Sequence, residues 1–102
     1  MPGRGNMIRV IVGYKFRDCG DASRLLFRLT SYAMTYPGFI GAENLQSLEV
    51  KSVIAMIETW DTREHWHAWE ASPIRRSIIH EWKHLLEEEP RVAEYRVVPS
   101  CG

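Results

Sequence analysis

The sequence predicts an α+β fold of the ferredoxin-like type, with an antiparallel sheet and helices on one face. Segments with the two-residue period of strands and the 3.6-residue period of helices alternate along the 102 residues in the order βαββααβ. That order is typical of a split βαβ arrangement. Residues 53–60 are apolar at most odd and even positions alike, which predicts a strand covered on both faces.

Each element follows from its periodicity and from the residues that begin or end it. The predicted elements are strand 7–17, helix 22–36, strand 39–48, strand 53–60, helix 62–71, helix 73–88 and strand 92–98. Pro37-Gly38 ends the first helix and Pro90 ends the third. Residues 49–52 form the hairpin connection between the two central strands.

Short polar residues predict where the helices begin. Asp21 is the expected cap of the first helix, and Asp61 with Glu64 has the spacing of a capping box for the second. Ser72 caps the third helix with Pro73 at its first position, where proline is tolerated. The stripes expected to face the sheet are Leu25, Leu29, Tyr32, Ala33 and Tyr36 on the first helix, and Ile74, Ile78, Trp82, Leu85 and Leu86 on the third.

Composition narrows the class of protein. Thirteen basic and thirteen acidic residues give no net charge, so the sequence predicts no nucleic-acid partner and no anionic membrane surface. No apolar run approaches the ~20 residues of a membrane span. Two cysteines, Cys19 and Cys101, are too few for a disulfide framework and are expected to be free thiols in a reducing cytoplasm. We expect a flexible leader at 1–6, with Met7 as the functional start, one domain at 7–99 and a tail at 100–102.

The helix-free face of the predicted sheet needs a partner. The apolar residues of strand 53–60 that point away from the helices exceed what a monomer normally exposes. A second copy of the chain, stacked on that face by twofold symmetry, would cover them. The sequence therefore predicts a homodimer.

Three short motifs resemble the antibiotic biosynthesis monooxygenase family of dimeric α+β barrels. They are Pro37-Gly38-Phe39, Trp60-Asp61 and Trp69-x-x-Ser72-Pro73, and the resemblance spans residues 7–98. It implies a homodimer with one cavity per subunit, between the helices and the sheet. The family includes cofactor-independent quinol-forming monooxygenases, heme-degrading enzymes and small proteins of unknown role.

Within this resemblance, position 69 is the most informative. Many quinol-type members carry histidine there, whereas this chain carries Trp69, as heme-degrading and some polyketide-oxidising members do. Gly13 stands where the heme-degrading pattern has asparagine. Ile79 stands where that pattern has its axial histidine, with His80 one position away. The resemblance thus supports an oxygenase more than a heme-degrading enzyme.

The second helix carries the expected site residues. Trp66 and Trp69 lie three residues apart on one face and could wall a cavity for a flat aromatic ligand; core packing is the alternative. His65 is the expected catalytic acid or base, because an imidazole can accept a proton near pH 7. A solvent-exposed histidine on a surface helix is the alternative for His65.

Further polar side chains could anchor a substrate. Asn44, Tyr36 and Tyr14 are the expected substrate-binding donors, although a backbone hydrogen bond would explain Asn44 equally well. Arg75 and Arg76 could hold an anionic substrate or simply form a solvated helix surface.

The segment His80-Glu81-Trp82-Lys83-His84 has the H-E-x-x-H spacing of zinc enzymes. At about 100° per residue, both histidines would point away from Ile78 and Trp82 and therefore toward solvent. We expect no metal site here.

The sequence predicts a cofactor-independent monooxygenase of a small electron-rich aromatic substrate, such as a hydroquinone or a polyketide anthrone. Two alternatives remain: a heme-binding or heme-degrading protein of the same fold, and a non-catalytic ligand-binding or regulatory dimer.

Overall fold

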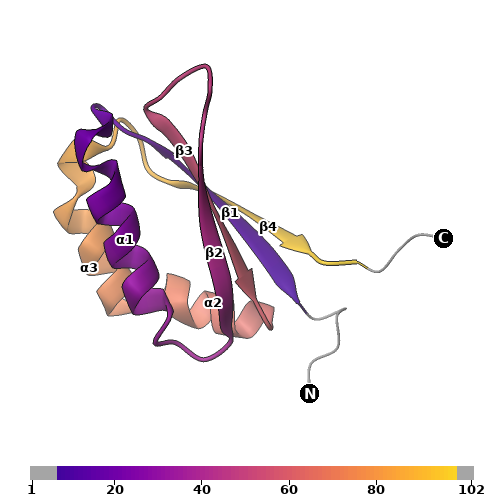
Figure 1. Cartoon of the computed structure of the whole chain (residues 1–102). Helices are drawn as coiled ribbons and strands as arrows, with labels where there is room; N and C mark the ends of the chain where they lie inside the picture. Colours follow the sequence, from indigo (N-terminus) through magenta and orange to yellow (C-terminus); the bar gives the residue numbers. More distant parts are fainter. Residues whose placement is uncertain (1–6, 99–102) are drawn as a thin grey trace.

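The computed structural model describes residues 7–98 and is drawn in Figure 1. Its strands are β1 (Ile8–Lys15), β2 (Phe39–Gln46), β3 (Val53–Trp60) and β4 (Arg91–Arg96). Its helices are α1 (Ala22–Ala33), α2 (Arg63–Glu70) and α3 (Pro73–Glu81), with short 3-10 turns at Cys19–Asp21 and Lys83–Leu85. The predicted leader, Cys101 and the predicted tail at 100–102 lie outside the described residues.

The four strands form one antiparallel sheet in the order β2-β3-β1-β4. Strand β1 lies in the middle, where Ile11 is opposite Ile57 of β3 on one side and Ala93 of β4 on the other. The three helices pack on a single face of this sheet (Figure 1). The predicted ferredoxin-like α+β fold is confirmed. No helix within residues 7–98 has the length and apolar character that crossing a membrane requires.

The core lies between the helices and the even-numbered positions of β1 and β3. Trp60, Trp66 and Trp69 are fully buried there and are among its largest side chains. Helix α1 contributes Ala22, Leu25, Leu26, Leu29 and Ala33. Tyr32 was predicted to face the sheet, but it is 40% exposed. It lies at the edge of the apolar stripe, beside the surface groove between α1 and α3.

The opposite face of the sheet has no helix over it. The odd-numbered residues of β3 point to this face and are all half-buried. Their neighbours by register are Ile11 beside Ile57 and Gly13 beside Ala55. Leu45 of β2 is 48% exposed, and Tyr95 of β4 is 56% exposed. Both strands that flank the sheet, β2 and β4, are therefore largely open to solvent within one chain.

Helix α3 ends at Glu81, seven residues before the end that the sequence predicted at 88. The chain after the helix is held to the end of β1 instead. Arg17 donates its backbone N–H to the Leu85 carbonyl (2.9 Å), and Glu87 donates to the Lys15 carbonyl (2.8 Å). These strand-like bonds and the burial of Leu86 outweigh the helical periodicity that continues in the sequence.

The capping predictions were partly right. Ser72 caps α3, because its Oγ accepts from the Arg75 N–H at 3.1 Å. Helix α2, however, is capped by Thr62, whose Oγ1 accepts from the His65 N–H at 3.2 Å. Asp61, the predicted cap, lies one residue earlier and instead accepts from the ring of His65. Asp21 precedes α1 without a capping hydrogen bond from its side chain.

Candidate functional site

A narrow internal cavity lies between α1, α3 and the sheet; we call it the inner cavity. About 210 Å³ of space between atoms lies in and around it, open solvent included, and no part of this space is wide enough for a water molecule. Its lining residues are Tyr14, Leu29, Thr30, Ala33, Phe39, Ala42, Met56, Glu58, Trp69 and Arg75. Most of these residues are apolar, so the chemistry of the cavity depends on its three ionisable side chains, Glu58, Tyr14 and Arg75.

Glu58 brings a carboxyl group into this apolar region. It occupies an even-numbered position of β3, pointing to the helices, and is only 3% exposed. The Trp60 indole Nε1–H donates a hydrogen bond to Glu58 Oε1 at 3.1 Å. Burial raises the pKa of Glu58 from 4.5 to about 6, because the charged form loses its hydration; the Trp60 hydrogen bond and the Arg75 charge offset only part of this rise.

Tyr14 and Arg75 complete the polar part of the cavity. Tyr14 lies near the carboxyl end of β1 and is 2% exposed. Burial raises the pKa of its phenol well above the usual value, although the nearby Arg75 guanidinium opposes that rise. Arg75 lies in the first turn of α3, where the Ser72 cap and Pro73 set the start of the helix. Its guanidinium lies over the Trp66 ring, 5.7 Å from the ring centre.

Arg75 is a buried cation without a direct counter-charge. It is 9% exposed, and no carboxylate within residues 7–98 lies in ion-pair range of it. Buried guanidinium groups normally pair with carboxylates, because losing hydration without a counter-charge is unfavourable. Arg75 therefore retains unused capacity to bind an anion.

Aromatic rings form one wall of the inner cavity. Trp69 of α2 is 1% exposed, and the Tyr36 ring meets it edge-on with centroids 5.0 Å apart. Trp66, on the same helix, packs against Trp60 with centroids 6.2 Å apart. The Trp66 indole N–H is buried without a hydrogen-bond partner among the described residues.

The structure brings together only some of the residues predicted to form the site. Tyr14 and Trp69 line the inner cavity, and Tyr36 contacts Trp69. Trp66 lies behind Arg75 and does not line the cavity. Asn44 is exposed and lines a separate surface groove between α1 and β2.

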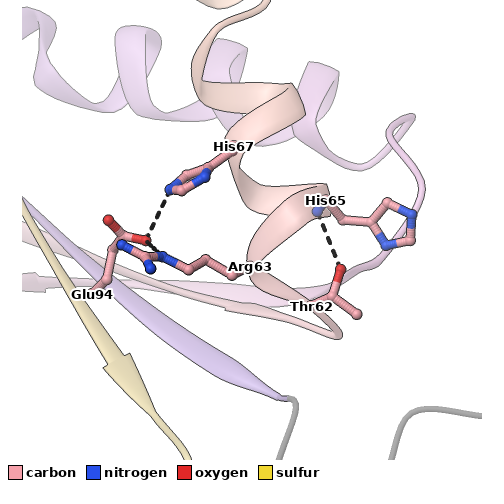
Figure 2. Close-up of polar contacts among 5 residues, drawn as sticks. All are labelled: Thr62, Arg63, His65, His67 and Glu94. Carbon is pink, nitrogen blue, oxygen red and sulfur yellow. Dashed lines mark hydrogen bonds and ion pairs between the residues drawn. The ribbon is translucent and has the colours of Figure 1, made fainter.

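His65 lies at the start of α2, outside the inner cavity. Its Nδ1 is 2.7 Å from Asp61 Oδ1, and its side chain is 42% exposed. In Figure 2 its ring points away from Glu94, whereas His67, two residues later, points toward that carboxylate. The catalytic role predicted for His65 therefore has no support from proximity to the cavity.

Glu58 was not among the predicted site residues, and Arg75 was considered only together with Arg76 as a residue that could hold an anionic substrate, although the sequence contains a signal for the burial of each. Glu58 is the one charged residue of the apolar strand 53–60, and it falls on the same face as Met56 and Trp60. Arg75 precedes Ile78 and Ile79 by three and four residues, which places it on the buried side of α3. Both signals required treating a charged residue as part of an apolar face.

A second, open hollow lies between α2, α3 and the chain leading into β4; we call it the outer hollow. Its volume is about 510 Å³, and Arg75 lines it as well as the inner cavity. The other lining residues are Glu70, Ala71, Arg76, Ile79, His80, Lys83, Glu89, Pro90 and Val92. The inner cavity and the outer hollow thus meet at the Arg75 side chain.

The H-E-x-x-H segment does not lie on one continuous helix. His80 belongs to the last turn of α3, whereas His84 lies in the following 3-10 turn. Both side chains are exposed. Within residues 7–98, no group of three or more histidine, cysteine or acidic side chains is arranged to hold a metal ion.

A polar cluster on the surface joins α2 to β4 (Figure 2). Glu94 Oε1 accepts from Arg63 Nε at 2.9 Å and lies 3.1 Å from His67 Nε2. The hydrogen bond from Arg63 and its charge hold the pKa of the Glu94 carboxyl below its usual value, with a smaller contribution from His67. We call Arg63, His67 and Glu94 the surface cluster.

Comparison with known protein families gives a direct match. The family model for antibiotic biosynthesis monooxygenases matches residues 20–81, more than half of the chain. The chain belongs to this family. A comparison with curated proteins found no relative.

Several solved structures share the fold of this chain. A proposed antibiotic biosynthesis monooxygenase from Nitrosomonas europaea has a TM-score of 0.81 at 17% identity, with both chains fully covered. SnoaB, a cofactor-independent oxygenase from Streptomyces nogalater, has a TM-score of 0.82 at 10% identity, covering 94% of this chain and 97% of that one. Rv0793 from Mycobacterium tuberculosis has a TM-score of 0.77 at 17% identity, covering 94% and 99%. At these identities the likeness shows a shared fold.

Proposed function

We propose that this chain is a cofactor-independent monooxygenase acting on a small electron-rich aromatic substrate, a hydroquinone or a polyketide-like anthrone, in the inner cavity. Membership of the antibiotic biosynthesis monooxygenase family supports the reaction class. The observation that carries the proposal is the buried Glu58 carboxyl, which faces an aromatic wall and has a pKa of about 6. Such a shift is typical of catalytic acids and bases.

Glu58 is the proposed general base. With a pKa of about 6, it is mainly ionised at pH 7, yet its carboxylate is poorly hydrated and so accepts a proton more readily than an exposed carboxylate does. Deprotonating a phenol or the CH₂ group of an anthrone leaves an electron-rich anion. Tyr14 and Arg75, which lie close to Glu58, would stabilise the negative charge on the substrate oxygen.

The substrate anion itself supplies the electrons for the reaction with dioxygen. For an anthrone, one electron passes from the carbanion to O₂, and the resulting radical pair combines to form a C–O bond. The peroxide takes back the proton that Glu58 removed, and the resulting hydroperoxide then loses the second hydrogen of the carbon, as a proton, together with its distal hydroxide, as water. One CH₂ group and one O₂ thus become one C=O group and one H₂O. The protein provides a dry pocket and moves the proton.

Substrate binding requires the side chains around the inner cavity to move apart, because the cavity does not admit even a water molecule in the present conformation. Phe39 and Thr30 are half-buried lining residues and are the freest to change rotamer. Lost packing among these side chains reduces the affinity that the aromatic wall gains from stacking.

Oxygen uptake with an anthrone and with a hydroquinone tests the proposal. Glu58→Gln keeps the shape of the side chain and should lower the turnover rate about 10²- to 10⁴-fold, the usual contribution of a general base. Glu94→Gln, a matched change in the surface cluster, should leave the rate within about twofold. His65→Gln should also leave it unchanged; if it abolishes uptake while Glu58→Gln does not, the base is His65.

A non-catalytic ligand-binding or regulatory dimer is the second candidate, and the narrowness of the inner cavity favours it. In that case the purified protein would consume no oxygen with any electron-rich aromatic tested. Tryptophan fluorescence would still respond to a ligand, because Trp69 lines the inner cavity and Trp66 lies next to it, against Arg75.

We also propose that two copies of the chain pair through the helix-free sheet face. This face contains Ile11, Ala55 and Ile57, which no helix or strand within residues 7–98 covers. An interface above about 1,000 Å² is expected for a stable dimer. Light scattering at micromolar concentration should give twice the chain mass, and Ile57→Arg should reduce it to one chain, whereas Ile74→Arg on exposed α3 should not. A wild-type monomer would contradict the proposal.

A further inference from the structure

We propose that Arg75 and the outer hollow form a binding site for the carboxylate group of a planar aromatic acid, whose ring lies in the inner cavity. The inference extends the proposed function by adding a charged group to the substrate. The position of the aromatic ring in the inner cavity rests on the proposed function, whereas the carboxylate site is argued independently from Arg75 and the residues around the outer hollow.

The first support is the state of Arg75. Its side chain is nine-tenths buried and makes no ion pair within the described residues, as shown above. Trp66 covers one face of the guanidinium, which leaves its edge to donate hydrogen bonds. A guanidinium edge matches a carboxylate, because its parallel N–H groups can contact both oxygens. A bound carboxylate would add a direct ion pair, which Glu58, although close enough for its pKa to be lowered by the Arg75 charge, does not form.

The second support is the position of Arg75 between two spaces. One side of the residue lines the apolar inner cavity and the other lines the outer hollow of about 510 Å³. Once the side chains around the inner cavity have moved apart, a ligand bound at Arg75 would have its apolar part there and its charged part in the hydrated hollow. That division suits a flat ring with one anionic substituent.

The charges around the outer hollow also favour an anion. Arg75, Arg76 and Lys83 carry positive charge there, against the carboxylates of Glu70 and Glu89. Glu89 is already engaged by Lys83, whose Nζ lies 3.9 Å from Glu89 Oε1. Arg76 is exposed and makes no ion pair within residues 7–98, so it remains available to a ligand.

The other route to the inner cavity lacks this character. The groove between α1 and β2 meets the inner cavity at Thr30, and no charged side chain is among its lining residues. The groove would suit an uncharged ligand. Charge therefore distinguishes the two entrances, and the outer hollow is the one for an acid.

A matched pair of probes tests the inference without requiring oxygenation. 2-Naphthoate and 2-naphthamide have the same ring and differ in the charge of one substituent. Binding is followed by quenching of tryptophan fluorescence at low salt. The wild-type protein should bind the acid at least about tenfold more tightly than the amide, as one charge-assisted bidentate contact predicts.

Variants assign that preference to residues. Arg75→Gln should make the two affinities equal, and Arg75→Lys should retain part of the preference because it keeps the charge but not the paired donors. Arg76→Gln, an exposed position that should not affect folding, should lower affinity for the acid a few-fold. Arg28→Gln is the control, because Arg28 lies on α1 and pairs with Glu81. Circular dichroism confirms that each variant is folded.

Several results would overturn the inference: equal wild-type affinities for acid and amide, no binding of either at millimolar concentration, or a preference that survives both Arg75→Gln and Arg76→Gln. Oxygen uptake with an uncharged anthrone is a separate readout. If that activity is present while the preference for the acid is absent, the proposed function stands and the anion site is wrong. If the preference is present without oxygen uptake, the anion site stands and the oxygenase proposal is wrong.

Discussion

Glu58 and Glu94 each lie near an arginine and near a ring nitrogen, that of Trp60 or of His67, but folding shifts the pKa values of their carboxyl groups in opposite directions. Glu94 lies at the surface of β4, where direct contact with Arg63 lowers its pKa. Glu58 lies inside, where burial raises its pKa to about 6 and Arg75 is too far away for an ion pair. Burial and contact distance therefore decide whether a carboxylate in this protein is a structural ion pair or a group suited to proton transfer.

The buried region should be far more sensitive to truncation than the surface region. Trp69 and His67 are both on α2, and one points into the core while the other joins the surface cluster. Trp69→Ala should lower the free energy of unfolding by about 3–5 kcal/mol, because it removes a large buried side chain. His67→Ala should cost about 0.5 kcal/mol or less. Urea denaturation measures both.

If Trp69 also contacts a ligand, Trp69→Ala should weaken the binding of a quinone-like compound and leave the mass of the assembly unchanged. A loss of stability below about 1 kcal/mol would contradict the tight packing of Trp69. Unchanged quinone binding would remove Trp69 from the site.

Replacing Glu58 should stabilise the protein at neutral pH. The pKa of a carboxyl is raised on folding, from 4.5 to about 6, so the folded state holds the proton more tightly than the unfolded state does. The contribution of Glu58 to stability is therefore most favourable below pH 4.5, becomes less favourable between pH 4.5 and 6, and stays unfavourable above that. Glu58→Gln should remove this fall and raise the free energy of unfolding at pH 7 by about 2 kcal/mol. The Gln side-chain oxygen can still accept from Trp60.

The measurement is chemical denaturation from pH 4 to pH 8 for the wild type and Glu58→Gln. A variant that is less stable than the wild type at pH 7 would show that the carboxylate is well stabilised in the core. The argument for a base with an unusual pKa would then be lost.

The surface cluster should show a smaller change with the opposite pH dependence. The pKa of Glu94 is lowered on folding, so its contribution is present above the unfolded pKa and disappears as the pH falls through the folded value. Glu94→Gln should cost about 0.5 kcal/mol at pH 7, as expected for a solvent-accessible ion pair, and less in high salt. Equal stabilities of wild type and variant at pH 7 in low salt would show that the pairing is energetically neutral.

The sequence predicted the order of elements well because that order depends on local periodicity and capping. Ser72 and Pro73 lie at the start of α3 itself, so the local sequence was enough to predict where this helix begins. The end of α3 was missed because it depends on Lys15 and Arg17, which are more than sixty residues away in sequence and bind the chain after Trp82. Such long-range backbone bonds leave no periodic signal.

The sequence indicated fewer of the residues that line the inner cavity, for a related reason. Aromatic residues such as Trp69 attract notice in a sequence, and Trp69 does line the inner cavity. Glu58 becomes notable only when its burial is known, because charged residues are usually exposed. Arg75 was considered as an anion-binding residue, but the sequence did not show that its side chain is buried beside Glu58. His65 was chosen for its intrinsic pKa, but the Thr62 cap places α2 so that the ring lies beside Asp61, away from the cavity.

Gly38 links three positions whose evolution should be coupled. Its φ angle is +88°, and a Cβ there would overlap the Asp61 carboxylate and the His65 ring. The Gly38 carbonyl also accepts from the Asp61 N–H at 2.8 Å. Position 38 therefore cannot drift to a larger residue by a single substitution. A smaller residue at 65 would not by itself open position 38, because the Cβ of residue 65 and the Asp61 carboxylate would still overlap the added atom and the positive φ would remain. Among descendants of this chain, Gly38 should therefore stay fixed, and changes at 61 and 65 should be limited to side chains that keep clear of it.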